Sequence, residues 1–145
     1  MSIDRHVDPE RAAFEAFKAL PRDAPVNMLN LVRFRALATY PDDHPNARKG
    51  LTGAEAYAAY GRDSDPIFTK VGGRVIWRGR METMLIGPAD EHWDALFVAH
   101  YPTAGAFLAM VTDPDYRRAV VHRQAAVETS RLVRCEGLGV EGGFA

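Results

Sequence analysis

The stretch Val26–Phe34, with the sequence VNMLNLVRF, decides the fold class. Its nine residues follow Pro25, and their apolar and branched side chains favour a β-strand. Alternate residues of a strand point to opposite faces, and here both faces are mostly apolar. One face carries Val26, Met28, Asn30, Val32 and Phe34, and the other carries Asn27, Leu29, Leu31 and Arg33. Such a strand is typically covered on both sides, so we expect a packed layer on each face of its sheet.

The patterns on either side of this strand indicate an alternation of helices and strands. Thr52 and Glu55 form a capping box that begins a helix, and Gly72 and Gly73 end it. Before the capping box lies a long polar loop, 36–51, of a length typical of lids or partner contacts. The predicted elements are a helix that Asp8 and Pro9 begin and Pro21 ends, strand 26–34, helix 52–71, strands 74–86 and 92–101, a helix from Thr103, a helix from Asp113 to about Glu128, and strand 131–136.

This order predicts an α+β fold of the ferredoxin-like β-α-β-β-α-β type, with an extra N-terminal helix. We expect a helical extension at 1–24, the ferredoxin-like domain at 25–136 and a flexible Gly-rich tail at 137–145. Helices on one face of a four-stranded antiparallel sheet leave the other face bare. That face carries Leu96 and Val98, which favours a homodimer formed by two sheets packed face to face. The alternative is that the opening helix or the tail covers this face within one chain.

Composition excludes several classes of function. The chain has 145 residues, 18 Lys and Arg against 19 Asp and Glu, and a net charge of −1. A near-neutral chain lacks the basic surface that binds nucleic acids or anionic membranes, so we expect neither partner. The single Cys135 excludes an internal disulfide framework. Met1–Glu10 contains no signal-peptide apolar region and no run approaches a membrane span, so we expect a cytoplasmic protein.

Several motifs stand in a fixed order along the chain. They are Asn27–Phe34, Tyr40–Asp42, Thr52–Tyr57 with Tyr60, Gly72–Gly79, Asp113–Tyr116 with His122 and Arg123, and Ser130–Leu132. Together they resemble the domain of unknown function 1330 family over most of the chain. This resemblance implies a dimeric α+β barrel. The superfamily with that architecture includes cofactor-free monooxygenases, dehydratases, isomerases and haem enzymes, so the resemblance does not select a reaction.

Two polar residues on predicted apolar faces are candidate ligand contacts. Asn30 interrupts an apolar strand face, and a buried amide needs partners from a ligand or from a neighbouring loop. Arg123 falls on the apolar stripe of its helix, where a guanidinium needs an anion. That anion is either an internal carboxylate, such as Glu82 or Glu128, or a ligand carboxylate or enolate. Snorkelling of the side chain along the helix is a third interpretation.

Three aromatic residues and a histidine complete the candidate site. Tyr57 and Tyr60 lie on one helical stripe, where a phenol can bind or protonate a ligand oxygen, or pack in the core. His122 flanks the stripe of Arg123 and is a candidate for proton transfer, with a solvated histidine and a haem ligand as alternatives. Trp77 is expected either to wall the pocket or to fill a dimer core.

The sequence therefore predicts a small-molecule pocket between the sheet and the helices. Our leading hypothesis is a cofactor-independent enzyme for a small carboxylate or enolisable substrate. In it His122 and Tyr57 are catalytic, and the ligand contacts are Asn30, Arg123, Tyr60 and Trp77. The alternative is a non-catalytic ligand-binding or structural homodimer. No metal or cofactor is expected, because there is no phosphate-binding glycine loop or HExxH helix, and His92 with Asp94 fits a solvated turn.

Overall fold

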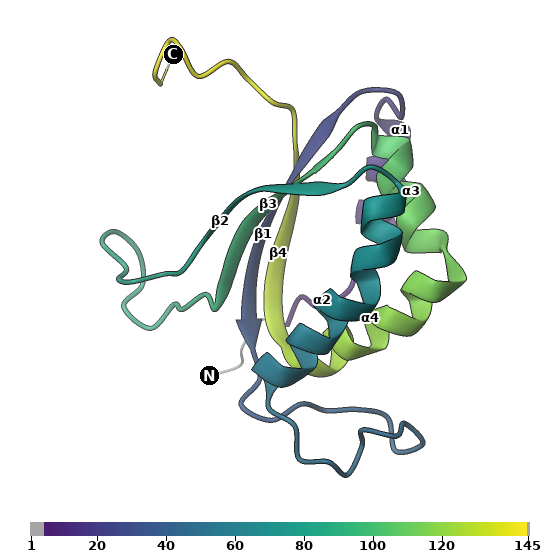
Figure 1. Cartoon of the computed structure of the whole chain (residues 1–145). Helices are drawn as coiled ribbons and strands as arrows, with labels where there is room; N and C mark the ends of the chain where they lie inside the picture. The colour runs from purple at the N-terminus through teal and green to yellow at the C-terminus, as the bar shows by residue number, and fades with distance from the viewer. Residues whose placement is uncertain (1–4, 145) are drawn as a thin grey trace.

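The protein is described by a computed structural model over residues 5–144. Residues 1–4 of the predicted extension and residue 145 of the predicted tail lie outside this range. The elements are α1 (Arg11–Ala19), β1 (Val26–Phe34), α2 (Gly53–Lys70), β2 (Arg74–Gly79), β3 (Ala95–Tyr101), α3 (Ala104–Thr112), α4 (Pro114–Ala126) and β4 (Val127–Cys135). Helices α2, α3 and α4 lie on one face of a single sheet (Figure 1). No helix in the described range is both long and apolar enough to span a bilayer.

Strand β1 lies inside the sheet, which explains why its sequence is apolar on both faces. The strand order is β2-β3-β1-β4, and all neighbours are antiparallel. The buried residues on the helix-facing side of β1 are Val26, Met28, Asn30 and Val32. The predicted ferredoxin-like α+β fold with a four-stranded antiparallel sheet is confirmed.

The start of α2 is held by local hydrogen bonds and by a close approach of two backbone segments. The predicted capping box is confirmed, because Thr52 Oγ1 accepts from Glu55 N and Glu55 Oε1 accepts from Thr52 N, each at 3.0 Å. The next residue, Gly53, donates its N–H to the carbonyl oxygen of Arg35. A Cβ atom at Gly53 would lie 2.1 Å from that oxygen, so glycine is the residue that fits here.

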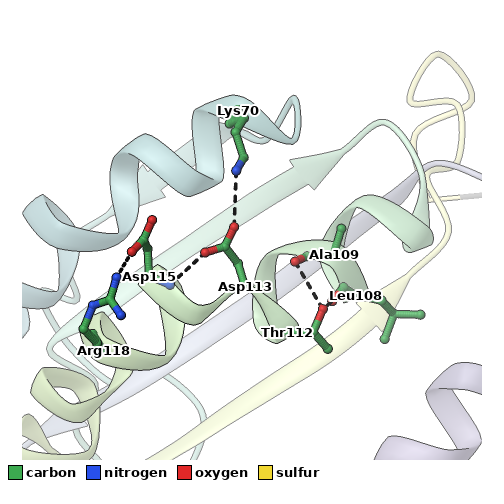
Figure 2. Close-up of polar contacts among 7 residues, drawn as sticks. All are labelled: Lys70, Leu108, Ala109, Thr112, Asp113, Asp115 and Arg118. Carbon is green, nitrogen blue, oxygen red and sulfur yellow. Dashed lines mark hydrogen bonds and ion pairs between the residues drawn. The ribbon is translucent and has the colours of Figure 1, made fainter.

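Asp113 joins three helices at the α3–α4 turn (Figure 2). Its Oδ1 accepts the backbone N–H of Asp115 at 2.8 Å, which caps α4, and its Oδ2 contacts Lys70 Nζ of α2 at 3.2 Å. Arg118 pairs with Asp115 one turn into α4, and Thr112 bonds back to carbonyls of α3. These contacts fix the ends of α2, α3 and α4 relative to one another.

The hairpin predicted from 74–86 and 92–101 is shorter than expected. Strand β2 ends at Gly79 and β3 begins at Ala95, so the segment 80–94 is irregular. Asp94 explains the start of β3, because its N–H donates to Val32 O and its Oδ2 accepts from Phe34 N at 2.7 Å. These bonds tie the chain to β1 just before β3 begins. Alternation in the sequence could not show where the strand pairing stops.

Two other predicted boundaries are wrong. The opening helix begins at Arg11, with Glu10 at the N-cap and no side-chain cap, rather than at Asp8 and Pro9. Strand β4 begins at Val127, immediately after α4, whereas we predicted a helix to about residue 128 and a strand from 131. A register shift lets Phe34 of β1 pair with Val127, so β4 begins directly after the helix.

The sheet face opposite the helices is covered only in part within the described residues, by Trp93, which packs against Arg131 on that face. Trp77 and Val133 point to this face, with 55% and 46% of their surface exposed. Helix α1 lies on the helix side, where Phe17 contacts Phe107 of α3 at 5.0 Å between ring centroids. Residues 137–144 form no helix or strand and extend past the end of the sheet (Figure 1). Neither segment covers the bare face, contrary to the alternative that one chain covers itself.

Candidate functional site

A large cavity lies between the helix-facing side of the sheet and helices α2 and α4. Its volume is about 1710 Å³, and residues His6–Glu10 and α1 form part of its wall. This exceeds the roughly 300–1,000 Å³ of typical ligand pockets, so the cavity includes open groove as well as a binding space. The predicted site residues that line it are Asn30, Tyr57, Tyr60 and Arg123. The structure thus brings four of the six predicted residues together.

Arg123 reaches the cavity wall from α4 and contacts only uncharged oxygens. Its Nη1 donates to the carbonyl oxygen of Val7, and its Nη2 donates to Ser130 Oγ at 3.1 Å. Ser130 Oγ donates in turn to His6 O at 2.7 Å. Of the two predicted internal carboxylates, Glu128 pairs with Arg33 instead. Arg123 forms no ion pair with any acidic residue in the described range, so its charge is available to an anion.

Three tyrosines from α2 and α4 contribute hydroxyl groups to the largely aromatic wall. The hydroxyl groups of Tyr60 and Tyr116 are 2.8 Å apart, and the rings of Tyr57 and Tyr60 are 5.5 Å apart. Burial raises the pKa of Tyr57 and of Tyr116 above the usual value for a phenol, and the nearby Arg123 only partly opposes this. Both phenols are therefore neutral hydrogen-bond donors at neutral pH. In the Tyr60–Tyr116 pair one hydroxyl donates to the other, which leaves the second proton free for a ligand.

Asn30 lies on the floor of the cavity at the centre of β1. Its Nδ2 donates to Met28 O at 3.0 Å, so one N–H is used within its own strand. The side-chain oxygen has no hydrogen-bond partner within the described residues, which leaves an acceptor for a ligand. Asn30 is 9% exposed, and its amide can form hydrogen bonds but does not ionise.

Trp77 does not belong to this cavity. The strand pairing shifts register between Val75 and Trp77, and Trp77 then lies opposite Val98. Val98 stands on the face away from the helices, because its neighbours Phe97 and Ala99 pair with helix-facing residues of β1. A one-residue bulge therefore turns Trp77 to the bare face, and its predicted role as a ligand contact has no geometric support.

His122 lies outside the cavity as well, on the flank of α4 next to α2 and the 36–51 loop. Its Nδ1 is 2.6 Å from the hydroxyl of Tyr40, and its Nε2 is 3.2 Å from Asp63 Oδ2 on α2. His44 packs against both rings, stacked on Tyr40 with centroids 4.5 Å apart. Burial lowers the pKa of His122 despite the opposing charge of Asp63. The lowered pKa favours the neutral imidazole at neutral pH. His122 ties the 36–51 loop to α2 and α4, apart from the residues that it was predicted to assist.

Sequence reasoning missed Tyr116 and Ser130 as site residues. Tyr116 stands on the same helical stripe as Arg123, two turns earlier, so the period of α4 could have identified it. The contact of Arg123 with Val7 O had no signal in the sequence, because any residue offers a backbone carbonyl. No group of three or more His, Cys, Asp or Glu side chains within residues 5–144 is arranged to hold a metal ion.

Comparison with known proteins places the chain in a family. The family described as "Domain of unknown function (DUF1330)" matches residues 47–138, which is well over half of the chain. The chain belongs to this family. The match begins after β1, so the resemblance read from Asn27–Phe34 lies outside the matched range. Among curated proteins none matches the chain.

Solved structures similar to this DUF1330 chain include two of one bacterial protein and one of a NIPSNAP-like domain protein. A protein of unknown function from Rhodopseudomonas palustris is 55% identical, with 94% of this chain and 99% of that chain covered and a TM-score of 0.87. A methylated form of that protein gives 53% identity, coverage of 96% and 99%, and a TM-score of 0.89. An uncharacterized NIPSNAP-like domain protein from Burkholderia xenovorans shares the fold alone, at 16% identity, coverage of 82% and 90%, and a TM-score of 0.51.

Proposed function

We propose that this chain binds a small carboxylate ligand in the cavity between its sheet and helices. The observation that carries the proposal is Arg123, a half-buried guanidinium at the cavity wall whose hydrogen-bond partners are neutral oxygens. A guanidinium presents a planar fork of donors that matches the two oxygens of a carboxylate. A carboxylate at this fork forms charge-assisted hydrogen bonds, which are stronger than those Arg123 makes to Val7 and Ser130.

The remaining polar groups suit the body of such a ligand. One hydroxyl proton of the Tyr60–Tyr116 pair is not used within the pair, and that hydroxyl group donates to a carbonyl or hydroxyl oxygen of the ligand. Asn30 Oδ1 accepts from a donor group of the ligand. The walls between them are aromatic and aliphatic, including Tyr57 and Phe97. A small-molecule site is usually lined by apolar side chains with a small number of polar groups among them. We therefore assign a ligand with one carboxylate, one further oxygen and an apolar body.

Non-catalytic binding fits the geometry better than turnover does. The enzyme hypothesis needs a proton acceptor beside the ligand, and His122 was predicted for that role. His122 lies outside the cavity, on the flank of α4 next to α2, and contacts Tyr40 and Asp63. The phenols at the cavity stay protonated, so they donate rather than abstract protons. Stabilisation of an enolate by these donors is the second candidate, and turnover of an enolisable carboxylate distinguishes it.

The test is calorimetric titration with a panel of small carboxylates, such as benzoate and 2-oxo acids, each paired with its uncharged alcohol. We expect at least one carboxylate to bind and its alcohol not to bind. Arg123→Gln keeps polarity but removes the charge, and we expect it to weaken binding by about tenfold or more. The proposal is abandoned if no carboxylate binds, or if Arg123→Gln binds as tightly as the unaltered protein. Metabolite consumption measured on the same samples tests the enzyme candidate.

We infer that the chain functions as a homodimer, with the two bare sheet faces packed together. Exposed Trp77 and Val133 stand on this face beside the half-buried Leu29, Leu31 and Val98. A contiguous apolar surface of this kind favours association, and a second copy presents a complementary sheet.

A further inference from the structure

The residues His6–Leu20, here called the N-terminal strap, bind the Arg123 guanidinium, which is the group that a ligand carboxylate needs. Arg123 Nη1 donates to Val7 O within the strap, and Ser130 Oγ, the partner of Nη2, donates to His6 O. Both donor positions of the Arg123 fork are thus satisfied by the strap or by a side chain that binds it. His6–Glu10 and α1 also line the cavity itself.

The strap is held by a small set of mostly part-buried hydrogen bonds, and by Val7 and Phe17, which are half-buried against the core. Helix α1 contributes no buried residue. Apart from the Arg123 and Ser130 bonds, His6 N donates to Thr129 Oγ1 and Gln124 Nε2 donates to Asp8 Oδ1, each at 3.2 Å. Further along, Arg134 donates to the carbonyls of Phe17 and Pro21. A segment with little buried apolar surface opens at low free energy.

We propose that the strap is an autoinhibitory element that a ligand carboxylate displaces from Arg123. The inference rests on the carboxylate site proposed above and adds its regulation. The two carboxylate oxygens take the positions of Val7 O and Ser130 Oγ on the guanidinium. The released carbonyls of His6 and Val7 are near the surface and hydrogen-bond to water instead. Ligand affinity is then reduced by the population of the closed strap, and loosening the strap raises it.

The experiment compares benzoate binding and hydrogen exchange in the full-length protein and in a loosened variant. Thr129→Val with Gln124→Ala removes the strap bonds to His6 N and Asp8 while keeping Arg123. Thr69→Val, at an exposed position of α2 away from the strap, is the matched control. Gln124→Ala alone, also at an exposed position, serves if the pair does not fold. Calorimetry measures affinity, and mass spectrometry measures amide exchange in peptides that cover residues 6–20.

We expect benzoate to increase exchange in 6–20, and the loosened pair to bind benzoate about fivefold more tightly or better, since each strap bond contributes modestly to closure. Benzyl alcohol is expected to change neither measurement. If only the variant with both substitutions binds benzoate, that result also supports autoinhibition by the strap. If benzoate binds through Arg123 with equal affinity in all proteins and without added exchange, the strap is not autoinhibitory and the carboxylate site stands. If benzoate binds to none of them, the strap inference is overturned, and the wider carboxylate panel decides the site.

Discussion

Arg123 combines a positive charge with neutral partners, and this combination sets how the protein should respond to its removal. If the partner were an internal carboxylate, loss of the arginine would leave a partly buried negative charge, at about 3 kcal/mol or more. The partners are instead Val7 O, in a half-buried residue, and Ser130 Oγ, in a buried one, and both oxygens are uncharged. Removal then sacrifices two hydrogen bonds and relieves the desolvation of a cation, and these effects oppose each other.

Arg123→Ala is therefore expected to change the free energy of unfolding of the ligand-free protein by about 1 kcal/mol or less. For a domain of this size the melting temperature should move by only about 3–4 °C. Scanning calorimetry measures this, with Arg118→Ala on the exposed side of the same helix as the control. A fall in the melting temperature of about 10 °C would indicate a carboxylate partner and contradict the assignment.

The hydroxyl pair of Tyr60 and Tyr116 predicts a non-additive pair of substitutions. Tyr60→Phe and Tyr116→Phe each remove the same 2.8 Å hydrogen bond and should each cost about 1 kcal/mol of unfolding free energy. Because the double variant leaves no unpaired hydroxyl behind, its loss should be close to that of one single variant. Urea unfolding of the four proteins completes the cycle. Simple additivity of the two losses would mean that the hydroxyls do not bond to each other.

His122 makes the stability of the protein depend on pH. Burial lowers its pKa below the unfolded value of about 6.5, so the unfolded chain binds a proton first as the pH falls. The stabilisation from neutral His122 is thus fully present above about pH 6.5 and is lost as the pH falls through the lower folded pKa. Urea unfolding at about pH 7.5 and about pH 5.5 measures the loss of unfolding free energy between the two conditions. The loss should be smaller in His122→Asn than in the unaltered protein, because asparagine cannot titrate.

An NMR titration that places the pKa of His122 at or above about 6.5 would contradict the prediction. Tyr40→Phe tests the same cluster, since it removes the donor to Nδ1 while leaving the ring stack with His44 in place.

Among the elements, α2 depends most clearly on a local sequence signal. Thr52→Ala removes the hydroxyl that accepts from Glu55 N, and we expect a loss of about 1 kcal/mol. Thr69→Ala replaces an exposed threonine inside the same helix and should be neutral or slightly stabilising, because alanine is the better helix former. Thermal unfolding followed by circular dichroism compares the two. Equal losses in both variants would show that the cap contributes nothing specific.

At the scale of the whole molecule, the bare sheet face predicts association. Light scattering at micromolar concentration should give about twice the 16.0 kDa of one chain. Val133→Glu places a charge on this face and should shift the mass towards one chain, because a buried unpaired carboxylate opposes sheet packing. Leu85→Glu, which lies outside the sheet and is 89% exposed, should leave the dimer intact. A monomer in the unaltered protein, or equal effects of the two variants, would rule out this interface.

Local interactions explain which features the sequence determined by itself. The apolar run of β1, the capping box of Thr52 and Glu55, and the cap of Asp113 depend on neighbours a few residues away, so the order of elements and the ferredoxin-like fold could be read directly. The period of the helices likewise placed Tyr57, Tyr60 and Arg123 on inward stripes, and alternation placed Asn30 on the helix side of β1. The structure puts all four at one cavity.

Only the tertiary structure decided the features that depend on residues far apart in the chain. A bulge in the pairing of β2 with β3 turned Trp77 to the opposite face, and the bonds of Asp94 to β1 held the chain where β3 begins. His122 pairs with Tyr40 and Asp63 because the 36–51 loop and α2 meet α4 there. The partner of Arg123 is a backbone carbonyl more than a hundred residues away, at Val7. Every residue has the same backbone carbonyl group, so the order of side chains in the sequence does not show which carbonyl an arginine contacts.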